Sequence, residues 1–395
     1  MRHMCLDVDG FSDPEGGNIK VRAIESKDGC TYLQCGTLKH LSYVMGPLIN
    51  NLESLGYQEG VNMFPVPFDW RLPPHFLEER DKYFTHLKEK IDACYENLKK
   101  PAVIIGHSMG NRIFQYFLNF VKDKYGQAWI DTHIHTWMAV GAPWLGAPKL
   151  LRGMISGERM GLDSLLSRQD AITLTRRLGS TMFLLPINEK LYWENLEEVN
   201  VKGKSFVYLK VNEKEVKEGY FHSKKNVYQP VKHETVFQAV GCPEIENQYQ
   251  QYYWKNPYFG SKEEGGMPAI LQPPPVARLY NIYGVGLETE KLYFYEKDKK
   301  GTFLLSRNCD IEIPHHIQKE GVGYETSKTP QKTLRHFGKT HYHRSGDGTV
   351  PYESLSYPNF IWDSSIKIKV KEIPNAEHRD IISTEALFNL LVPVI

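Results

Sequence analysis

The chain lacks the long apolar runs that carry a protein across a membrane. None of its uncharged apolar stretches approaches the roughly 20 residues that a membrane-spanning helix needs. The opening sequence Met1–Asp7 is not followed by the apolar segment of a secretory signal peptide. The sequence therefore predicts that any membrane contact is peripheral.

An excess of charge of one sign is also missing. Lys and Arg total 48 and Asp and Glu total 47 in 395 residues, so the formal net charge is +1. Proteins that bind nucleic acid typically carry a basic excess or a basic stripe. We therefore expect no nucleic-acid partner.

Cysteine is scarce and scattered. None of the six cysteines stands in a C-x-x-C pair, which argues against a zinc site and against a dense disulfide framework. Cys30 and Cys35 could pair, although free thiols are favoured. No N-x-S/T sequon is present, which disfavours a heavily glycosylated secreted protein.

The most informative stretch is Pro101–Asn111, with the sequence PAVIIGHSMGN. The apolar run Ala102–Ile105 predicts a buried parallel strand that stops at a G-x-S-x-G pattern. Gly106 and Gly110 stand where a sharp strand-to-helix turn is expected to exclude a Cβ atom. The pattern predicts a nucleophile elbow with Ser108 at its tip.

An amphipathic helix is predicted to begin directly after this serine. Its apolar residues recur at helical spacing and are Ile113, Phe114, Phe117, Leu118 and Val121. The first amides of such a helix point toward the serine and favour negative charge there. The Met109 N–H is therefore the predicted oxyanion donor.

The flanking sequence predicts an α/β protein with a doubly wound parallel sheet. Strands are predicted at Ile19–Ile24, Asn62–Val66, Thr136–Val140, Ala277–Tyr283 and Ile366–Val370, and helices at Leu38–Leu55, Leu77–Leu98 and from about Ile381. Asp69 and Arg71 could form a catalytic pair, but an ion pair that holds the loop after a strand is favoured.

The helix–strand alternation breaks between about Leu150 and Pro275. We predict a hydrolase core at residues 1–150 and 276–395, with an inserted cap at 151–275. The aromatic stretch Tyr249–Trp254 could line a lipid-facing surface, although packing inside a small domain is favoured.

Two later loops supply candidate partners for the serine. Asp347 lies between glycines after a strand region, and His378 lies between the last strand and the last helix. In α/β-hydrolases the chain order is nucleophile, acid, base, which Ser108, Asp347 and His378 obey. The rival histidines, none of which lies in the last loop, are His315, His316, His336, His341 and His343.

Five motifs extend over nearly the whole chain: Pro67–Leu72, His107–Gly110, Gly141–Trp144, Gly346–Pro351 and His378. Together they resemble the lecithin:cholesterol acyltransferase family. Leu77–Phe84, Asn111 and Trp129–His135 are most similar to the plant-type phospholipid:sterol acyltransferases, with phospholipid:diacylglycerol acyltransferases next.

The resemblance implies an α/β-hydrolase fold with a cap and serine acyl-enzyme chemistry without metal or cofactor. It implies catalytic roles for Ser108, Asp347 and His378 and a substrate-binding role for Trp144. The implied partners are a phospholipid acyl donor, a lipid alcohol acceptor (sterol or diacylglycerol) and a peripheral membrane surface. The implied location is an endomembrane, with the endoplasmic reticulum favoured.

Two alternatives stay open. A phospholipase A or acylhydrolase would use the same residues with water as acceptor. The second alternative is an inactive homologue. Members of the family begin with a strand, a V-P-G type oxyanion loop and a lid. We find no counterpart of these segments from Met1 onward. Ile19–Ile24 is followed by Glu25–Gly29 rather than by a glycine-rich oxyanion loop, so we expect an N-terminal truncation, with Gly36–Thr37 as the next oxyanion candidate.

Overall fold

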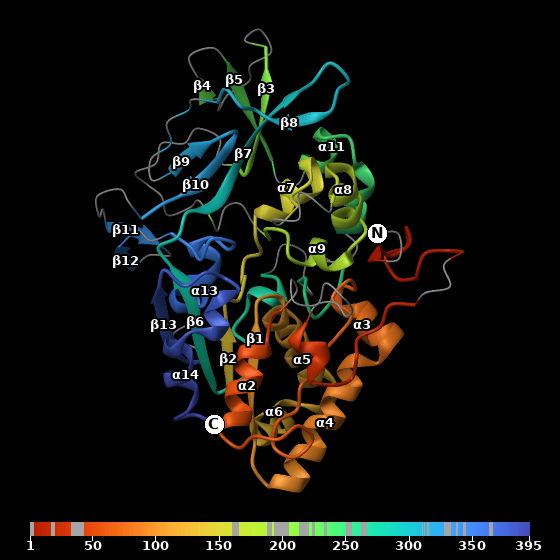
Figure 1. The fold of residues 1–395 in the computed structure, drawn as a ribbon, viewed down its shortest axis with the longest axis vertical. Coiled ribbons are helices and arrows are strands. Elements are labelled where there is room, and N and C mark those ends of the chain that lie inside the picture. Colours follow the sequence, from red (N-terminus) through yellow and green to blue (C-terminus); the bar gives the residue numbers. More distant parts are fainter. Residues whose placement is uncertain are drawn as a thin grey trace.

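The architecture is mixed α/β, with two main sheets placed one above the other (Figure 1). The computed structural model describes residues 4–16, 20–32, 43–159, 166–187, 192, 205–212, 221–222, 226–232, 235–249, 255–261, 267–309, 311, 313, 316–327, 333–336, 339–342, 345–362 and 366–395.

The first sheet is parallel, and the motif serine directly follows its first strand. Its strands run in the order β1 (Ala102–His107), β2 (Ile134–Val140), β6 (Arg278–Val285) and β13 (Lys367–Pro374). All three pairings are parallel, as the sequence predicts. Because β1 stands at one end of this order, its outer edge pairs with no strand in the described part of the chain.

Helices cover both faces of this sheet, and the alternation of side chains along β2 shows how. Trp137 and Ala139 join one core cluster with α4 (Tyr83–Leu98) and α5 (Met109–Tyr125). Met138 and Val140 join another. The second cluster includes side chains of α2 (Gly46–Ser54), the 3₁₀ helix η7 (Asp380–Ser383) and α14 (Glu385–Leu391). Successive residues of a strand face opposite ways, so both faces of the sheet are buried at β2.

The second sheet lies in the upper half of Figure 1. Its order is β4 (Phe221–His222), β5 (Val227–Val231), β3 (Val207–Val211), β7 (Thr289–Lys297), β10 (Val322–Glu325) and β9 (His316–Lys319), and β8 (Phe303–Leu305) also pairs with β7. β3 pairs in parallel with β7, so this sheet takes strands from both sides of residue 275. The predicted division into residues 151–275 and 276–395 cuts through it.

The remaining elements are short. They are α1 (Lys27–Thr31), α3 (Pro74–Asp81), α6 (Gln127–His133), α7 (Lys149–Ser156), α8 (Arg168–Arg176), α9 (Gly179–Phe183), α11 (Val236–Ala239), α12 (Pro243–Tyr249), η6 (Ala269–Leu271), α13 (Tyr352–Ile361) and the hairpin β11 (Thr333–His336) and β12 (Lys339–Tyr342). Among the described helices, none is long and apolar enough to cross a membrane.

Two predicted strands are wrong. Asn62–Val66 forms only an isolated bridge through Met63, and its Pro65 lacks the N–H that a ladder requires. Residues 20–24, the described part of the other, have no sheet partner. There the carbonyl of Val21 accepts a hydrogen bond from Arg71 Nη2 at 3.0 Å instead.

One predicted helix is two. Lys82 has a φ of 51° and separates α3 from α4 within the expected Leu77–Leu98 helix. The Glu78 carboxylate explains the break, because it accepts from the amides of Phe84 and Thr85 at 3.0 and 3.1 Å. A carboxylate at a helix N-terminus satisfies amides that would otherwise have no partner.

Candidate active site

The turn between β1 and α5 has the geometry of a nucleophile elbow. Ser108 is the single residue between them, with φ 51° and ψ −124°. A non-glycine residue at positive φ is strained and is held there only by its surroundings. Here the Ser108 N–H donates to the Val140 carbonyl at 2.9 Å, and Asn111 Nδ2 donates to the same oxygen at 3.0 Å.

The two glycines of the motif differ in whether their position has room for a Cβ atom. A Cβ on Gly106 would lie 2.3 Å from Asn111 Oδ1, so this position requires glycine. A Cβ on Gly110 would have nothing within 4 Å, so the predicted crowding there is wrong. The elbow is crowded on the strand side and open at the second residue of the helix.

The structure brings Ser108, His378 and Asp347 together from three distant parts of the chain. Ser108 Oγ lies 2.8 Å from His378 Nε2, and Asp347 Oδ2 lies 2.6 Å from His378 Nδ1. A carboxylate only accepts, so Nδ1 carries the proton and Nε2 can accept from the serine hydroxyl. A hydrogen-bonded relay of this kind can transfer the serine proton to the imidazole.

The electrostatics of His378 suit a base. Burial alone would lower the pKa of this imidazole, but the Asp347 carboxylate, through its charge and its hydrogen bond, raises that pKa above the usual value. Glu377 also raises the pKa of His378, and Arg379 lowers it. The ring is 9% exposed and Asp347 is 1% exposed, so solvent screens their interaction little.

His107 is a neighbour that the sequence analysis did not single out. Its Nε2 lies 2.8 Å from the backbone carbonyl of His378, and a carbonyl only accepts, so Nε2 carries the proton. Burial, with the charge of His378 adding to it, lowers the pKa of His107 to about 4. His107 therefore stays neutral and ties the His378 backbone to the end of β1. Its position next to the serine is the only sequence signal for this role.

Room for the imidazole comes from a glycine after β2. Gly141 has φ +58°, and a Cβ there would lie 3.3 Å from the His378 ring. A residue with a side chain at position 141 would therefore crowd the His378 ring beside the nucleophile.

Comparison with known proteins places the chain in a family. The sequence pattern of the family described as lecithin:cholesterol acyltransferase matches residues 2–387. The chain belongs to this family.

Relatives within the lecithin:cholesterol acyltransferase family carry three kinds of name. The Schizosaccharomyces pombe phospholipid:diacylglycerol acyltransferase is 28% identical over 100% of this chain and 65% of its own length. The Arabidopsis thaliana phospholipid–sterol O-acyltransferase is 25% identical over 95% of this chain and 63% of its own length. The rat lysosomal phospholipase A and acyltransferase is 25% identical over 94% of this chain and 70% of its own length. The chain thus spans less than two thirds of the first two, and these identities do not separate the diacylglycerol type from the sterol type.

Other motif residues that carried the family resemblance have structural positions. Asp69 and Arg71 form the expected ion pair, with Asp69 Oδ2 2.7 Å from Arg71 Nη2 and 2.6 Å from Arg80 Nη2. Trp144 has no exposed surface, packs between Trp137 and Trp362, and donates through Nε1 to Asn281 Oδ1 at 3.1 Å. It lies in the core, and the substrate-binding role implied for it stays a prediction.

The Met109 amide, the rival histidines and the cysteine pair are the other residues that the sequence predictions name. Met109 is the first residue of α5, so its N–H has no acceptor within the helix, and its oxyanion role stays a prediction. Of the rival histidines, His315 and His343 lie outside the described residues, while His316, His336 and His341 lie on β9, β11 and β12. Cys30 is a free thiol, and Cys35 lies outside the described residues.

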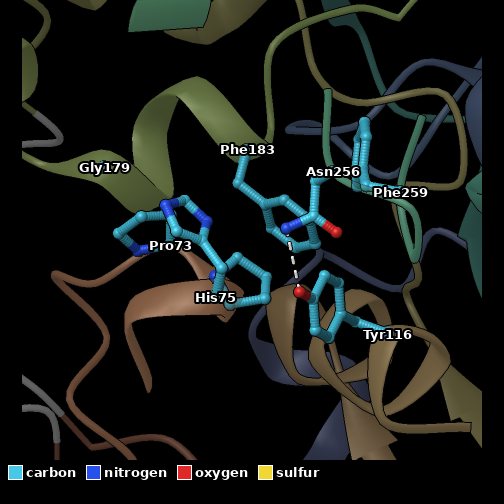
Figure 2. A pocket seen from close by; sticks show the side chains of 8 residues that line it. Pro73, His75, Tyr116, Gly179, Phe183, Asn256 and Phe259 are labelled. Carbon is cyan, nitrogen blue, oxygen red and sulfur yellow. Dashed lines mark hydrogen bonds between the residues drawn. The ribbon is translucent and has the colours of Figure 1, made fainter. Parts of the chain in front are cut away.

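A small cavity opens farther along α5 (Figure 2). Its lining includes His75, Tyr116, Phe183 and Asn256, and Asn256 Nδ2 donates to the Tyr116 hydroxyl at 2.9 Å. The cavity measures about 10 Å³, which is room for one water molecule. It is too small for an acyl chain, and no residue of the Ser108–His378–Asp347 relay lines it.

The raised pKa of His378 leads to a pH prediction. The imidazole must be neutral to accept the serine proton, so the rate of Ser108 acylation should fall as pH drops through the His378 pKa, with a midpoint above about 6.5. Asp347→Asn removes the charge that favours the protonated ring and should move this midpoint to lower pH while slowing acylation. The measurement is the labelling rate with a fluorophosphonate between pH 5 and 9.

Asp131→Asn is the matched control, because Asp131 is exposed on α6 and accepts a hydrogen bond from Gln127 Nε2 there. Its pH profile should equal that of the wild type. An Asp347→Asn midpoint that does not move would show that Asp347 does not set the His378 pKa.

Proposed function

We propose that this protein is a serine acyltransferase that moves a fatty acyl group from a phospholipid to a lipid alcohol, a sterol or diacylglycerol. The observation that carries the proposal is the relay of Ser108, His378 and Asp347 at a strained elbow, in a chain that belongs to the lecithin:cholesterol acyltransferase family. The names of the relatives supply the substrate class.

The first step forms an acyl-enzyme. His378 Nε2 takes the hydroxyl proton while Ser108 Oγ attacks the ester carbonyl of the phospholipid. Asp347 stabilises the imidazolium, and the Met109 N–H donates to the carbonyl oxygen as it becomes negative. When the tetrahedral intermediate collapses, the C–O bond of the ester breaks, His378 returns the proton to the leaving oxygen, and a lysophospholipid departs.

The second step reverses these roles. His378 takes the proton of the acceptor hydroxyl, the acceptor oxygen attacks the acyl-serine carbonyl, and the bond between the acyl carbon and Ser108 Oγ breaks. His378 then returns the proton to Ser108. The product is a lipid ester, and no metal or cofactor enters either step.

The proposal extends to fold and location. We propose an α/β-hydrolase core around the first sheet, with a cap that includes the second sheet and therefore continues past residue 275. Peripheral contact with an endomembrane, the endoplasmic reticulum in particular, follows from the substrates proposed.

Hydrolysis is the second candidate, and a specific observation favours it. A relative at 25% identity is named a phospholipase A as well as an acyltransferase. Both activities proceed through one acyl-serine, and they differ in whether water or a lipid alcohol reaches it.

The deciding experiment follows the acyl chain. Phospholipid vesicles with a labelled acyl group are incubated with the protein alone, with a sterol and with diacylglycerol, and Ser108→Ala is the control. The proposal expects labelled ester that grows at the expense of labelled fatty acid when an acceptor is present. Fatty acid alone in every mixture would establish the hydrolase, and no release together with no fluorophosphonate labelling would establish an inactive homologue.

A further inference from the structure

A buried cluster of charges lies beside the loop that carries Asp347. It consists of Lys291 on β7, Glu325 on β10 and Glu353 on α13, with exposed fractions between 0 and 3%. Lys291 Nζ lies 2.6 Å from Glu353 Oε1 and 3.6 Å from Glu325 Oε2. Buried charges are costly unless they are paired, and one lysine here faces two carboxyl groups. Glu353 is the nearer partner of Lys291, and Glu325 is the farther one.

Glu325 makes its hydrogen bonds to the backbone of the Asp347 loop. Its Oε1 accepts from the Gly346 N–H at 2.7 Å and from the Tyr352 N–H at 2.8 Å. These two amides stand on either side of Asp347, one directly before it and the other after the turn at Val350. One oxygen atom therefore closes the loop at both ends.

The second sheet contributes two further contacts to the same loop. Thr289 Oγ1, at the start of β7, accepts from the Gly348 N–H at 2.9 Å. Ser327 Oγ, just beyond β10, accepts from the Ser345 N–H at 2.8 Å. The loop that carries the acid of the relay is thus held by side chains of the other sheet.

The position of this loop bears directly on the base. Asp347 Oδ2 contacts His378 Nδ1 at 2.6 Å, and the Asp347 carbonyl accepts from the His378 N–H at 3.0 Å. Inside the loop, Asp347 Oδ1 accepts from the amides of Thr349 and Val350 at 3.1 and 2.8 Å. A loop released at its ends would carry the carboxylate away from the imidazole.

We propose that Glu325 is the positioning residue of the catalytic acid: its Oε1 clamps the amides of Gly346 and Tyr352 and thereby fixes Asp347 against His378. The proposal rests on the proposed function, since it assigns Asp347 the role of acid. Glu325 touches neither substrate nor reacting atom and acts through the backbone of the loop.

The charge state of the cluster fits this role. Burial, reinforced by the nearby Glu353 carboxylate, raises the pKa of Glu325 to about 8. A proton on Oε2 leaves Oε1 able to accept both amides, so the clamp holds in either form. The glutamine side chain offers the same acceptor, which makes Glu325→Gln the conservative variant and Glu325→Ala the disruptive one.

The test measures the pH dependence of Ser108 labelling in each variant. It also measures kcat, KM and thermal stability. Glu325→Ala should lower kcat by up to about 10²-fold, the size expected when a catalytic group is misplaced by ~1 Å, with KM unchanged. Its labelling midpoint should move to lower pH, because Asp347 no longer stabilises the protonated imidazole. Glu325→Gln should keep the wild-type midpoint and a kcat close to that of the wild type.

Glu290→Gln is the matched control. Glu290 is a buried glutamate on β7, and its Oε1 accepts from Arg152 Nη1 at 2.7 Å. Its substitution should affect stability and leave the labelling midpoint in place. The other groups around His378, which are His107, Glu377 and Arg379, stay unchanged in every variant.

Each result either supports the Glu325 clamp or overturns it. A wild-type midpoint in Glu325→Ala, or a Glu325→Gln that behaves like Glu325→Ala, overturns the clamp. If Glu325→Ala does not fold, Glu325→Asp decides, since it keeps the carboxyl group and withdraws it by one methylene. A shifted midpoint in Glu325→Asp supports the clamp, and an unshifted one overturns it. Failure of the proposed function is distinct: the wild type would then not be labelled, or Ser108→Ala would be labelled equally.

Discussion

Ser108→Ala should abolish turnover, with a loss of kcat on the order of 10⁶-fold. The hydroxyl oxygen is the only atom that the substitution removes, and it lies 2.8 Å from His378 Nε2. Without it no acyl-enzyme forms, and the remaining groups can only assist attack by water. The measurement is release of labelled acyl groups from phospholipid vesicles, together with fluorophosphonate labelling.

The fold should change little in this variant. Alanine at position 108 meets the same positive φ as serine, and the Ser108 N–H still donates to the Val140 carbonyl. The thermal unfolding midpoint should therefore stay within a few degrees of the wild type. Ser54→Ala, at an exposed site on α2, is the control and should retain full activity. Activity of Ser108→Ala within tenfold of the wild type would refute the elbow assignment.

The relay residues could be predicted from sequence because their signals are local. The Gly106–Gly110 motif follows an apolar strand and opens an amphipathic helix, and both neighbours are visible within about twenty residues of Ser108. Asp347 and His378 follow from chain order and from their loops, each of which ends a strand region. The parallel first sheet follows from the alternation of helices and strands.

The second sheet could not be predicted because its pairing is not local. β3 pairs in parallel with β7, and Val207 and its partner Tyr293 are 86 positions apart in the sequence. No periodicity in either strand indicates such a partner, and the boundary predicted at residue 275 rests on the break in the helix–strand alternation. Glu325 was missed for the same reason, since nothing near it in sequence shows that it reaches Gly346.

One helix was predicted with the wrong bounds because a side chain overrides the periodic pattern. The apolar spacing of Leu77–Leu98 continues through Lys82, yet the Glu78 carboxylate caps the amides of Phe84 and begins a new helix there. The orientation of the Trp144 ring, which is buried against Trp137, could not be predicted either. Residue type and spacing alone do not reveal which way such a ring turns.

His378→Ala should be nearly as damaging as loss of the serine, with kcat reduced by at least about 10³-fold. The variant leaves the Ser108 hydroxyl with no acceptor for its proton, so the serine stays a weak nucleophile near neutral pH. It also leaves Asp347, which is 1% exposed, without the ring that its Oδ2 contacts. Some loss of stability is therefore expected beside the loss of activity, and thermal unfolding separates the two effects.

The double variant Ser108→Ala/His378→Ala gives the sharper result. Because the serine and the histidine act as one unit, the double loss should equal the larger single loss rather than the product of the two. His86→Ala, at an exposed position on α4, is the control for removing an imidazole and should keep full activity. Losses that multiply in the double variant would mean that His378 acts independently of Ser108, and the base would then have to be sought at another histidine.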